Sequence, residues 1–146
     1  MFTRLLLAWD ASPPAQRALD LAVSVARRYG AEIVAVSVAH SPTHAETEED
    51  RIESVEATRR FFEDSFARVR DRAERAGVAV EHVIIEGEEP AQDMIGYAHE
   101  HGFDLVVAGH HREGRRPGRL VLHGLADHLV AHSDVPVLIV GDRAGE

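Results

Sequence analysis

Short apolar runs alternate along the chain with longer stretches in which apolar residues recur every three or four positions. The first two runs span residues 4–9 and 32–38 and are too short for helices, whereas Leu19, Ala22 and Ala26 between them recur at helical spacing. Strands covered on both faces read as continuous apolar runs, and helices that cover a sheet need only one apolar face. The alternation therefore predicts a parallel sheet with helices on both faces.

Residues suited to helix ends mark the element boundaries. Asp10 and Ser12 offer side-chain caps before a helix over residues 13–29, and Gly30 follows as a residue that accepts positive φ. A polar connection over residues 40–48 comes next. The remaining elements are expected to be a long helix ending at Gly77, strands over 78–85, 103–108 and 135–140, and helices over 90–101 and from about 119 to 132. This order predicts one Rossmann-like α/β domain over residues 1–146, with five parallel strands.

Composition excludes several classes of protein. The chain has no cysteine, so it contains neither disulfides nor thiolate metal sites. Its formal net charge of −9 argues against a general nucleic-acid binder, which needs a basic face. No stretch approaches the roughly 18 apolar residues of a membrane span, and no secretory signal is recognisable, so we expect a cytoplasmic protein without a membrane partner.

Ligands of open α/β sheets bind beyond the carboxyl ends of the strands, which makes the segments that follow strands the candidate site. The segment after the fourth strand, GHHREGRRPGR, is the richest in chemistry, because glycines permit close backbone approach and arginine forks suit phosphate oxygens. We therefore expect an anionic or nucleotide ligand here. The candidate residues are Ala8, Trp9, Asp10, Val38, Gly109, His111, Arg112, Gly114, Arg115, Arg116 and Arg119.

Each of these residues also has a purely structural interpretation. The loop of arginines and glycines has the composition of a solvated connection. Trp9 is placed either to stack on a base or to fill the top of the core, and we favour packing. Asp10 is placed either to hydrogen-bond a ligand or to cap the first helix, and we favour capping.

Neither a metal site nor an enzyme motif is complete. His128 and His132 lie four residues apart on a predicted helix, a spacing used for two metal ligands, but no carboxylate completes a recognised motif. The sequence also lacks GxSxG, HExxH and GxxxxGK[ST]. We expect no metal and no catalytic residues.

Three segments together resemble the universal stress protein family. They are LLLAWDASPPAQRAL after the start of the chain, FDLVVAGHH around the fourth strand and LVLHGLADHLVAHSDVPVLIV at the end. The likeness runs from about residue 3 to residue 140 in the same element order. It implies strand order 3-2-1-4-5 and a homodimer that pairs its fifth strands, here residues 135–140. Pairing would also cover an apolar edge strand.

Family members that bind ATP carry glycine, two residues, glycine, nine residues, then glycine and serine or threonine. Gly109 matches the first glycine, but Arg112 stands at the second. Counting back from the last strand places His123 and Gly124 at the final pair. A register shifted by one places Gly124 and Leu125 there and uses Gly114, and neither register restores the hydroxyl. The GHH sequence resembles the branch of the family that lacks the ATP pattern.

The resemblance implies a regulatory or protective module without strong ATP binding or turnover. The alternative is a switch that binds ATP or AMP through Arg112, Arg115, Arg116 and Arg119 in place of the family's glycines. His123 and Gly124 join the candidate site under this alignment.

Overall fold

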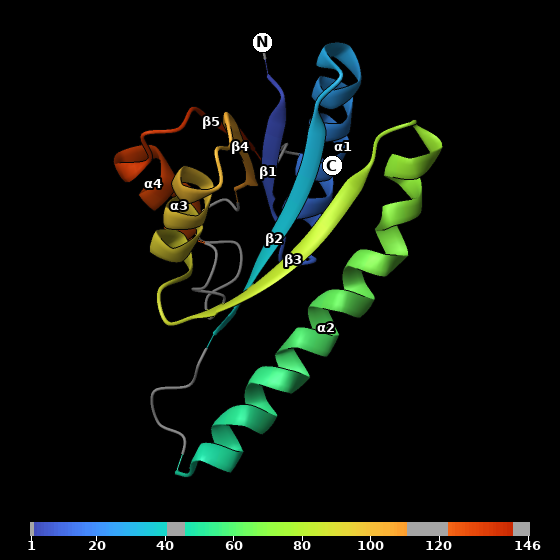
Figure 1. Ribbon diagram of the computed structural model, residues 1–146. Coiled ribbons are helices and arrows are strands. Elements are labelled where there is room, and N and C mark those ends of the chain that lie inside the picture. The colour runs from blue at the N-terminus through green and yellow to red at the C-terminus, as the bar shows by residue number, and fades with distance from the viewer. Residues whose placement is uncertain (1, 41–45, 111–122, 142–146) are drawn as a thin grey trace.

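The computed structural model describes residues 2–40, 46–110 and 123–141, with the side chains of 123 and 124 left out. Helices and strands alternate strictly along the chain (Figure 1). The elements are β1 (Arg4–Ala8), α1 (Pro13–Tyr29), β2 (Glu32–His40), α2 (Glu48–Arg75), β3 (Val80–Gly87), α3 (Pro90–Glu100), β4 (Leu105–Gly109), α4 (His123–His132) and β5 (Val137–Val140). No helix in the described ranges is long and apolar enough to cross a membrane.

The strands form one parallel sheet in the order β3-β2-β1-β4-β5, as predicted. The chain first moves outward from β1 through β2 to β3 and then returns to place β4 on the other side of β1. The strand order therefore reverses between β1 and β4. In sheets of this kind the crevice for ligands opens at that reversal, beyond the carboxyl ends of the strands.

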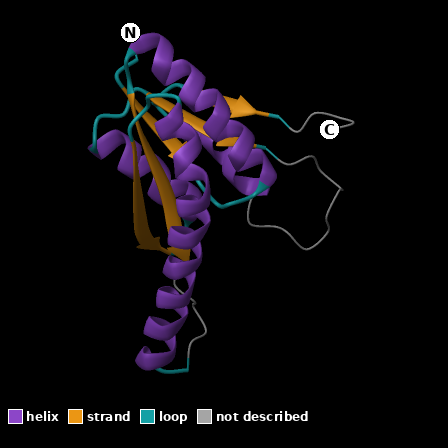
Figure 2. Ribbon diagram, turned by 90° about the vertical axis from the view of Figure 1, so that its right-hand side faces the viewer, coloured by secondary structure: helices purple, strands orange, loops and turns teal. Residues whose placement is uncertain are grey.

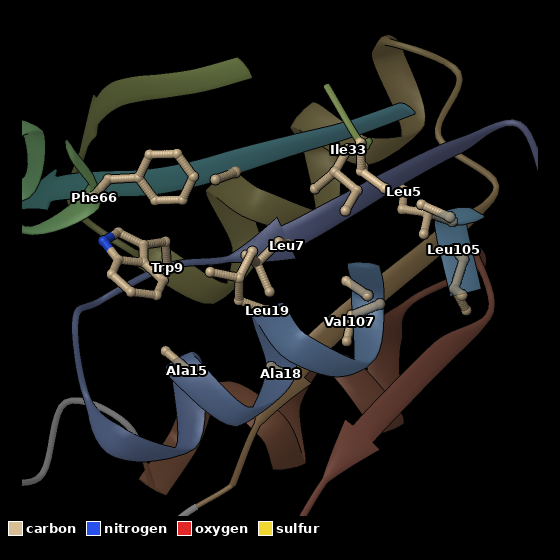
Figure 3. Packing of buried hydrophobic residues seen from close by; sticks show 14 residues of the cluster. Leu5, Leu7, Trp9, Ala15, Ala18, Leu19, Ile33, Phe66, Leu105 and Val107 are labelled. Carbon is tan, nitrogen blue, oxygen red and sulfur yellow. The ribbon is translucent and has the colours of Figure 1, made fainter. Parts of the chain in front are cut away.

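Two helices cover each face of the sheet. Alternate side chains of the first strand serve the two faces: Leu5 and Leu7, followed by Trp9, pack with α1 and α2 in one cluster, whereas Leu6 and Ala8 pack with α3 and α4 in the other. Figure 3 shows the first cluster around Leu7 and Trp9. Figure 2 views the molecule from the side of α1 and α2, which lie in front of the strands. Burial on both faces explains why the central strands β1, β2 and β4 read as continuous apolar runs.

Capping places Ser12, rather than Asp10, at the start of α1. The Ser12 hydroxyl accepts a hydrogen bond from the backbone N–H of Ala15 at 3.2 Å. Asp10 instead orients the capping residue Ser12, because the Asp10 Oδ1 accepts hydrogen bonds from the Ser12 N–H at 3.0 Å and from the Ser12 hydroxyl at 2.6 Å. The helix ends at Gly30, whose φ of 69° lies in the left-handed region. The capping function expected of Asp10 is therefore indirect.

Helix α2 begins inside the acidic stretch that follows β2. Thr47 caps it by accepting from the Asp50 N–H at 3.0 Å, and three acidic residues occupy the first turn, where they favour the helix dipole. Of the connection expected at residues 40–48, positions 41–45 lie outside the described residues. In Figure 1 the first turns of α2 extend past the carboxyl ends of the strands. The helix thus forms a wall beside the ligand crevice.

All five strands differ from the expected ranges at one end or both. β1 ends one residue earlier, at Ala8, β2 continues to His40 instead of 38, and β4 covers Leu105–Gly109 instead of 103–108. β3 runs from Val80 to Gly87 instead of 78–85, because the N–H of Val78 bonds the Ala73 carbonyl of the preceding helix, while the strand continues beside β2 up to Gly87. β5 covers Val137–Val140 instead of 135–140, since Val135 lies in a turn closed by the Ser133 side chain.

Candidate functional site

A small hollow lies at the carboxyl ends of β1, β2 and β4, where the strand order reverses. Its volume is about 60 Å³, and we call it the inner hollow. Its lining is mostly apolar and comes from three strand ends and from all four helices or the segments leading into them. The lining residues are Ala8, Trp9, Asp10, Ser12, Ala15, Val38, Phe62, Pro90, Met94, Gly109 and Leu125.

Five of the predicted site residues meet around the inner hollow: Ala8, Trp9, Asp10, Val38 and Gly109. The other eight predicted residues are not among the described residues that line the inner hollow. His111, Arg112, Gly114, Arg115, Arg116 and Arg119 lie outside the described residues. His123 and Gly124 begin α4, and only their backbone is described. The strand-end half of the predicted site is therefore assembled by the fold.

A larger hollow opens directly outside the inner one. This outer hollow has a volume of about 740 Å³, within the range of small-molecule sites. Four residues line both spaces, namely Val38, Phe62, Pro90 and Leu125. Its remaining described lining consists of His40, Thr58, Glu89, Ala91, Gln92 and His128. Because Val38 and His40 belong to the last residues of β2, a ligand in the outer hollow lies directly against the end of this strand.

The backbone of Val38 faces this space with both of its polar groups. The Val36 carbonyl accepts from the Trp9 N–H at 3.0 Å, so the polar groups of Val36 point toward β1. Those of Val38, two residues on, point the same way. β1 has ended by then, with Ala8 opposite Val36, and no hydrogen bond within the described ranges joins Val38 to that segment. One donor and one acceptor are left side by side at the hollow.

The N-terminus of α1 is not an anion site. Pro13 and Pro14 have no N–H, the N–H of Ala15 bonds the Ser12 hydroxyl, and that of Gln16 bonds the Ser12 carbonyl at 3.0 Å. The first four positions therefore offer no free donor. Helix α3 differs, because it has no side-chain cap hydrogen bond and its first turn, Pro90 to Gln92, lines the outer hollow.

Trp9 is a packing residue, as favoured from the sequence. It is 2% exposed, its ring meets Phe66 edge-on with centroids 5.3 Å apart, and its Nε1–H donates to the Ser65 hydroxyl at 3.1 Å. Figure 3 shows the indole beside Phe66. A ring held in this way is unavailable for stacking on a base, but it forms part of the wall of the inner hollow.

Gly109 is required by packing as well as by the site. A Cβ at this position would lie 2.5 Å from the backbone carbon and oxygen of Pro14. The end of β4 therefore rests directly on the first turn of α1, a contact that only glycine allows. The close approach draws the strand end and the cap of α1 around the inner hollow.

The charged side chains on the described walls are acidic. Asp10 lines the inner hollow and Glu89 the outer one, and no arginine belongs to the described lining of either. The nearby Arg51 is held by Glu48 and Glu86, and this pairing raises the pKa of Arg51 above its usual value. The described lining of the two hollows thus supplies no guanidinium to an anionic ligand.

A buried polar chain supports the end of β1 from the α2 side of the sheet. Ser37 Oγ donates to the Trp9 carbonyl at 2.8 Å and lies 3.0 Å from His82 Nε2. Because the single hydroxyl hydrogen is already committed, the neutral His82 ring must donate from Nε2. Burial, with a smaller contribution from the Arg70 charge, lowers the pKa of His82 to about 4. His82 is thus neutral at physiological pH.

The fold added six lining residues that sequence patterns did not identify: Ser12, Ala15, Phe62, Pro90, Met94 and Leu125. Phe62 lies within the long helix that the sequence predicts, and Pro90 is the first residue of the helix predicted over 90–101. Ser12 was recognised only as a cap. The signal in each case indicated an element, and its place in the site depends on how the helices pack.

No group of three or more metal-ligating side chains occurs in the described part of the chain. His128 and His132 do share a face of α4, with ring centroids 4.5 Å apart. His128 also lines the outer hollow. Two imidazoles without a third ligand do not make a structural metal centre.

Comparison with known proteins identifies relatives over nearly the whole chain. A family model described as the universal stress protein family matches residues 1–141. A putative universal stress protein from Staphylococcus haemolyticus is 30% identical over 95% of this chain and 84% of its own length. The universal stress protein UspA structure from Lactobacillus plantarum superposes with a TM-score of 0.81 at 23% identity, covering 95% and 97% of the two chains.

Two further solved structures of the family contain a nucleotide. One from Archaeoglobus fulgidus is in complex with dAMP (TM-score 0.66, 18% identity, 96% and 98% coverage), and one from Arabidopsis thaliana has AMP bound (0.65, 19%, 97% and 93%). At these identities the likeness shows the shared fold alone. The family model and the S. haemolyticus relative carry the assignment: this chain belongs to the universal stress protein family.

Proposed function

We propose that this protein is a regulatory module that binds an adenine nucleotide at the carboxyl ends of β1, β2 and β4, without turning it over. The observation that carries the proposal is the pair of Val38 backbone groups that has no partner on the β1 side, beside the two hollows. Adenine presents an adjacent donor and acceptor on its base-pairing edge, and one backbone N–H and C=O match this pair. Relatives crystallised with AMP and dAMP add support.

The apolar lining suits the body of a base. Phe62, Pro90 and Leu125 line both hollows and offer flat or apolar surface beside Val38. The volume of about 740 Å³ accommodates a nucleoside monophosphate. Asp10 stands at the end of β1, although its Oδ1 already holds the cap of α1. The base is thus recognised mainly by backbone and shape.

Phosphate recognition is weaker on this wall. Asp10 and Glu89 repel added negative charge, and the first four positions of α1 offer no free N–H. The backbone of the first turn of α3 and the arginines of residues 112–119 are the remaining partners for phosphate. We therefore expect AMP to bind at least as well as ATP, in keeping with the departure of the loop from the family's ATP pattern.

Calorimetric titration of the purified protein with adenosine, AMP and ATP, with and without Mg²⁺, tests the proposal. We expect saturable binding of AMP, with ATP no tighter than AMP. Raising the salt concentration should lower the affinity for AMP but not the affinity for adenosine, because only AMP carries a charge that salt screens. Absence of binding by all three at millimolar concentration would refute nucleotide binding. ATP binding more than tenfold tighter than AMP would refute the monophosphate preference.

Two variants distinguish the contribution of the loop to affinity from the contribution of the strand-end hollows. Replacing Arg115 and Arg116 by alanine should reduce AMP affinity while leaving adenosine affinity unchanged. Replacing Phe62 by alanine should reduce both affinities to a similar degree, since the base loses apolar surface. Equal losses for AMP and adenosine in the arginine variant would show that the loop acts on the fold and not on phosphate.

We also propose that two copies pair through β5. This strand is the edge of the sheet, bonded to β4 on one side, and its four residues remain partly exposed. Even-numbered residues face β4, since the Pro136 carbonyl accepts from the Val106 N–H and the Val140 carbonyl accepts from the N–H of His110, which directly follows β4. The N–H of Ile139 therefore points outward. An unpaired apolar edge is a surface that folded proteins usually cover.

Sedimentation analysis of two variants tests this pairing. Ile139→Pro removes the outward N–H and should convert a dimer to a monomer, whereas Ile139→Val keeps that N–H and should remain dimeric. A monomeric wild-type protein at micromolar concentration would refute the proposal. A dimer that survives Ile139→Pro would place the interface elsewhere.

A further inference from the structure

A second cavity lies between α1 and α2, apart from the strand-end site. This α1–α2 cleft has a volume of about 580 Å³, again within the range of small-molecule sites. Its lining comes from the loop after β1, the first turn of α1 and the middle of α2. The lining residues are Trp9, Ala11, Gln16, Phe61, Asp64, Ser65, Arg68 and Val69. Only Trp9 also lines the inner hollow.

The cleft holds an acid and a base that do not neutralise each other. Asp64 and Arg68 are exposed, and within the described ranges neither makes an ion pair or a side-chain hydrogen bond. Charged neighbours further along α2 are paired: Arg72 lies 3.7 Å from Asp20, and Arg75 lies 2.6 Å from Asp71. Opposite charges four residues apart on a helix are close enough to pair. This pair instead remains free for a ligand.

An aromatic surface completes the cleft. Phe61 is 50% exposed although it is one of the largest apolar side chains of α2. It stacks on Phe62, with ring centroids 5.6 Å apart and an interplanar angle of 27°. Phe62 also lines the two strand-end hollows. Phe61 thus presents a ring, held in place from behind, beside Asp64 and Arg68.

We propose that the α1–α2 cleft binds a zwitterionic amino acid with an aromatic or large apolar side chain. Its carboxylate pairs with the Arg68 guanidinium, whose planar fork suits a carboxylate, and its ammonium group pairs with Asp64. Its side chain lies against Phe61 and Val69. A ligand with a single charge leaves either Asp64 or Arg68 unpaired and binds less tightly.

The loop after β1 shows that this region is held in an unusual conformation. Ala11 has a φ of 70°, the one positive φ among the described non-glycine residues, and it lies between Trp9 and Ser12 of the strand-end site. Strained backbone is found preferentially beside functional sites. The indole N–H of Trp9, bonded to Ser65 in the wall of the cleft, provides a resolved spectroscopic reporter.

The experiment is a ¹⁵N NMR titration of the full chain with L-phenylalanine, following the Trp9 indole N–H and the Ala11 amide. We expect saturable shifts at both. Two analogues dissect the charges: 3-phenylpropionate lacks the ammonium group and 2-phenylethylamine lacks the carboxylate. Each should bind at least tenfold more weakly than L-phenylalanine. No saturable shift with L-phenylalanine at tens of millimolar would overturn the proposal, as would equal affinity for all three compounds.

Exposed substitutions test the assigned contacts without threatening the fold. Asp64→Asn should abolish the preference for L-phenylalanine over 3-phenylpropionate, and Arg68→Gln should abolish its preference over 2-phenylethylamine. Phe61→Ala should weaken the binding of all three compounds. Asp71→Asn, on the same helix but outside the cleft, is the matched control and should change none of these affinities. Unchanged preferences in both charge variants would overturn the assignment.

Discussion

His82 should make the folded protein lose stability as the pH falls from about 6.5 toward 4. Burial of its ring, helped by the Arg70 charge, lowers the pKa from the ordinary 6.5 to about 4. The unfolded chain therefore takes up a proton before the folded chain does. Above about pH 6.5 the ring is neutral in both states and does not affect the free energy of unfolding. As the pH falls from 6.5 to about 4, the free energy of unfolding decreases, and below about pH 4 the ring lowers it no further.

The size of the effect follows from the two pKa values. A fall from 6.5 to about 4 sets an upper bound of about 3.4 kcal/mol, at roughly 1.4 kcal/mol for each pKa unit. The ring is only part-buried, between Phe66 at a centroid distance of 4.6 Å and Ser37. Solvent screening reduces the bound, and we expect about 1–2 kcal/mol.

The assay compares wild type with His82→Gln, which keeps a donor for Ser37 but does not titrate. Urea denaturation at pH 7.5 and pH 4.5 gives the stability difference between the two proteins, in which contributions from the acidic residues cancel. The wild type should lose about 1–2 kcal/mol relative to the variant at the lower pH. The exposed His132, changed to Gln, is the control for removing one imidazole.

Two results would refute this reasoning. One is a constant stability difference between wild type and His82→Gln from pH 7.5 to 4.5. The other is an NMR titration in which the His82 ring protonates near pH 6.5 in the folded state. Either would mean that the ring is hydrated and that the Ser37 contact does not hold it in the sheet.

Three further substitutions test the geometry of the strand ends by urea denaturation. Gly109→Ala should cost about 1–3 kcal/mol, because its Cβ meets the Pro14 backbone; a neutral result would contradict the close packing. Ala11→Gly should stabilise the fold by about 1 kcal/mol by relieving the positive φ, and a loss of stability would show that the φ is not a strain. Ser12→Ala should cost about 1 kcal/mol by removing the cap on Ala15, and no loss would show that Asp10 caps the helix directly.

The fold followed from the sequence because its signals are local and repeated. Four of the strands contain apolar runs, β3 alternates in part, and the helices carry terminal residues of recognisable type, such as Ser12 before α1 and Gly30 after it. Strand order came from the family resemblance and was confirmed by the sheet. The boundary errors at β3 and β5 arose where a helix cap or a turn uses apolar residues, as at Val78 and Val135.

The candidate site was predicted only where it coincides with strand ends. Asp10 and Val38 follow from topology alone, since the carboxyl ends of parallel strands share one edge. Phe62 and Leu125 reach the hollow from helices whose apolar positions all looked alike in the sequence. Helical periodicity identifies the buried face but not the neighbour that buries it. Periodicity also gives no indication of Phe61, because an exposed ring in a cleft does not belong to the buried face of its helix.

The strand-end site exists because neighbouring strands stop at different places. β1 has five residues and β2 nine, and their starts are in register at Arg4 and Glu32. Beyond Ala8 the chain turns into α1, where Pro13 and Pro14 fix the helix and supply no N–H for a ladder. The last residues of β2 are thereby left without a partner on the β1 side. The segment that starts α1 thus leaves the Val38 backbone without a partner on the β1 side. The same segment has no free N–H at the start of α1 that could bind a phosphate. Under the proposed function, the sheet edge therefore recognises the base, and among the described elements only the first turn of α3 offers a backbone partner for phosphate.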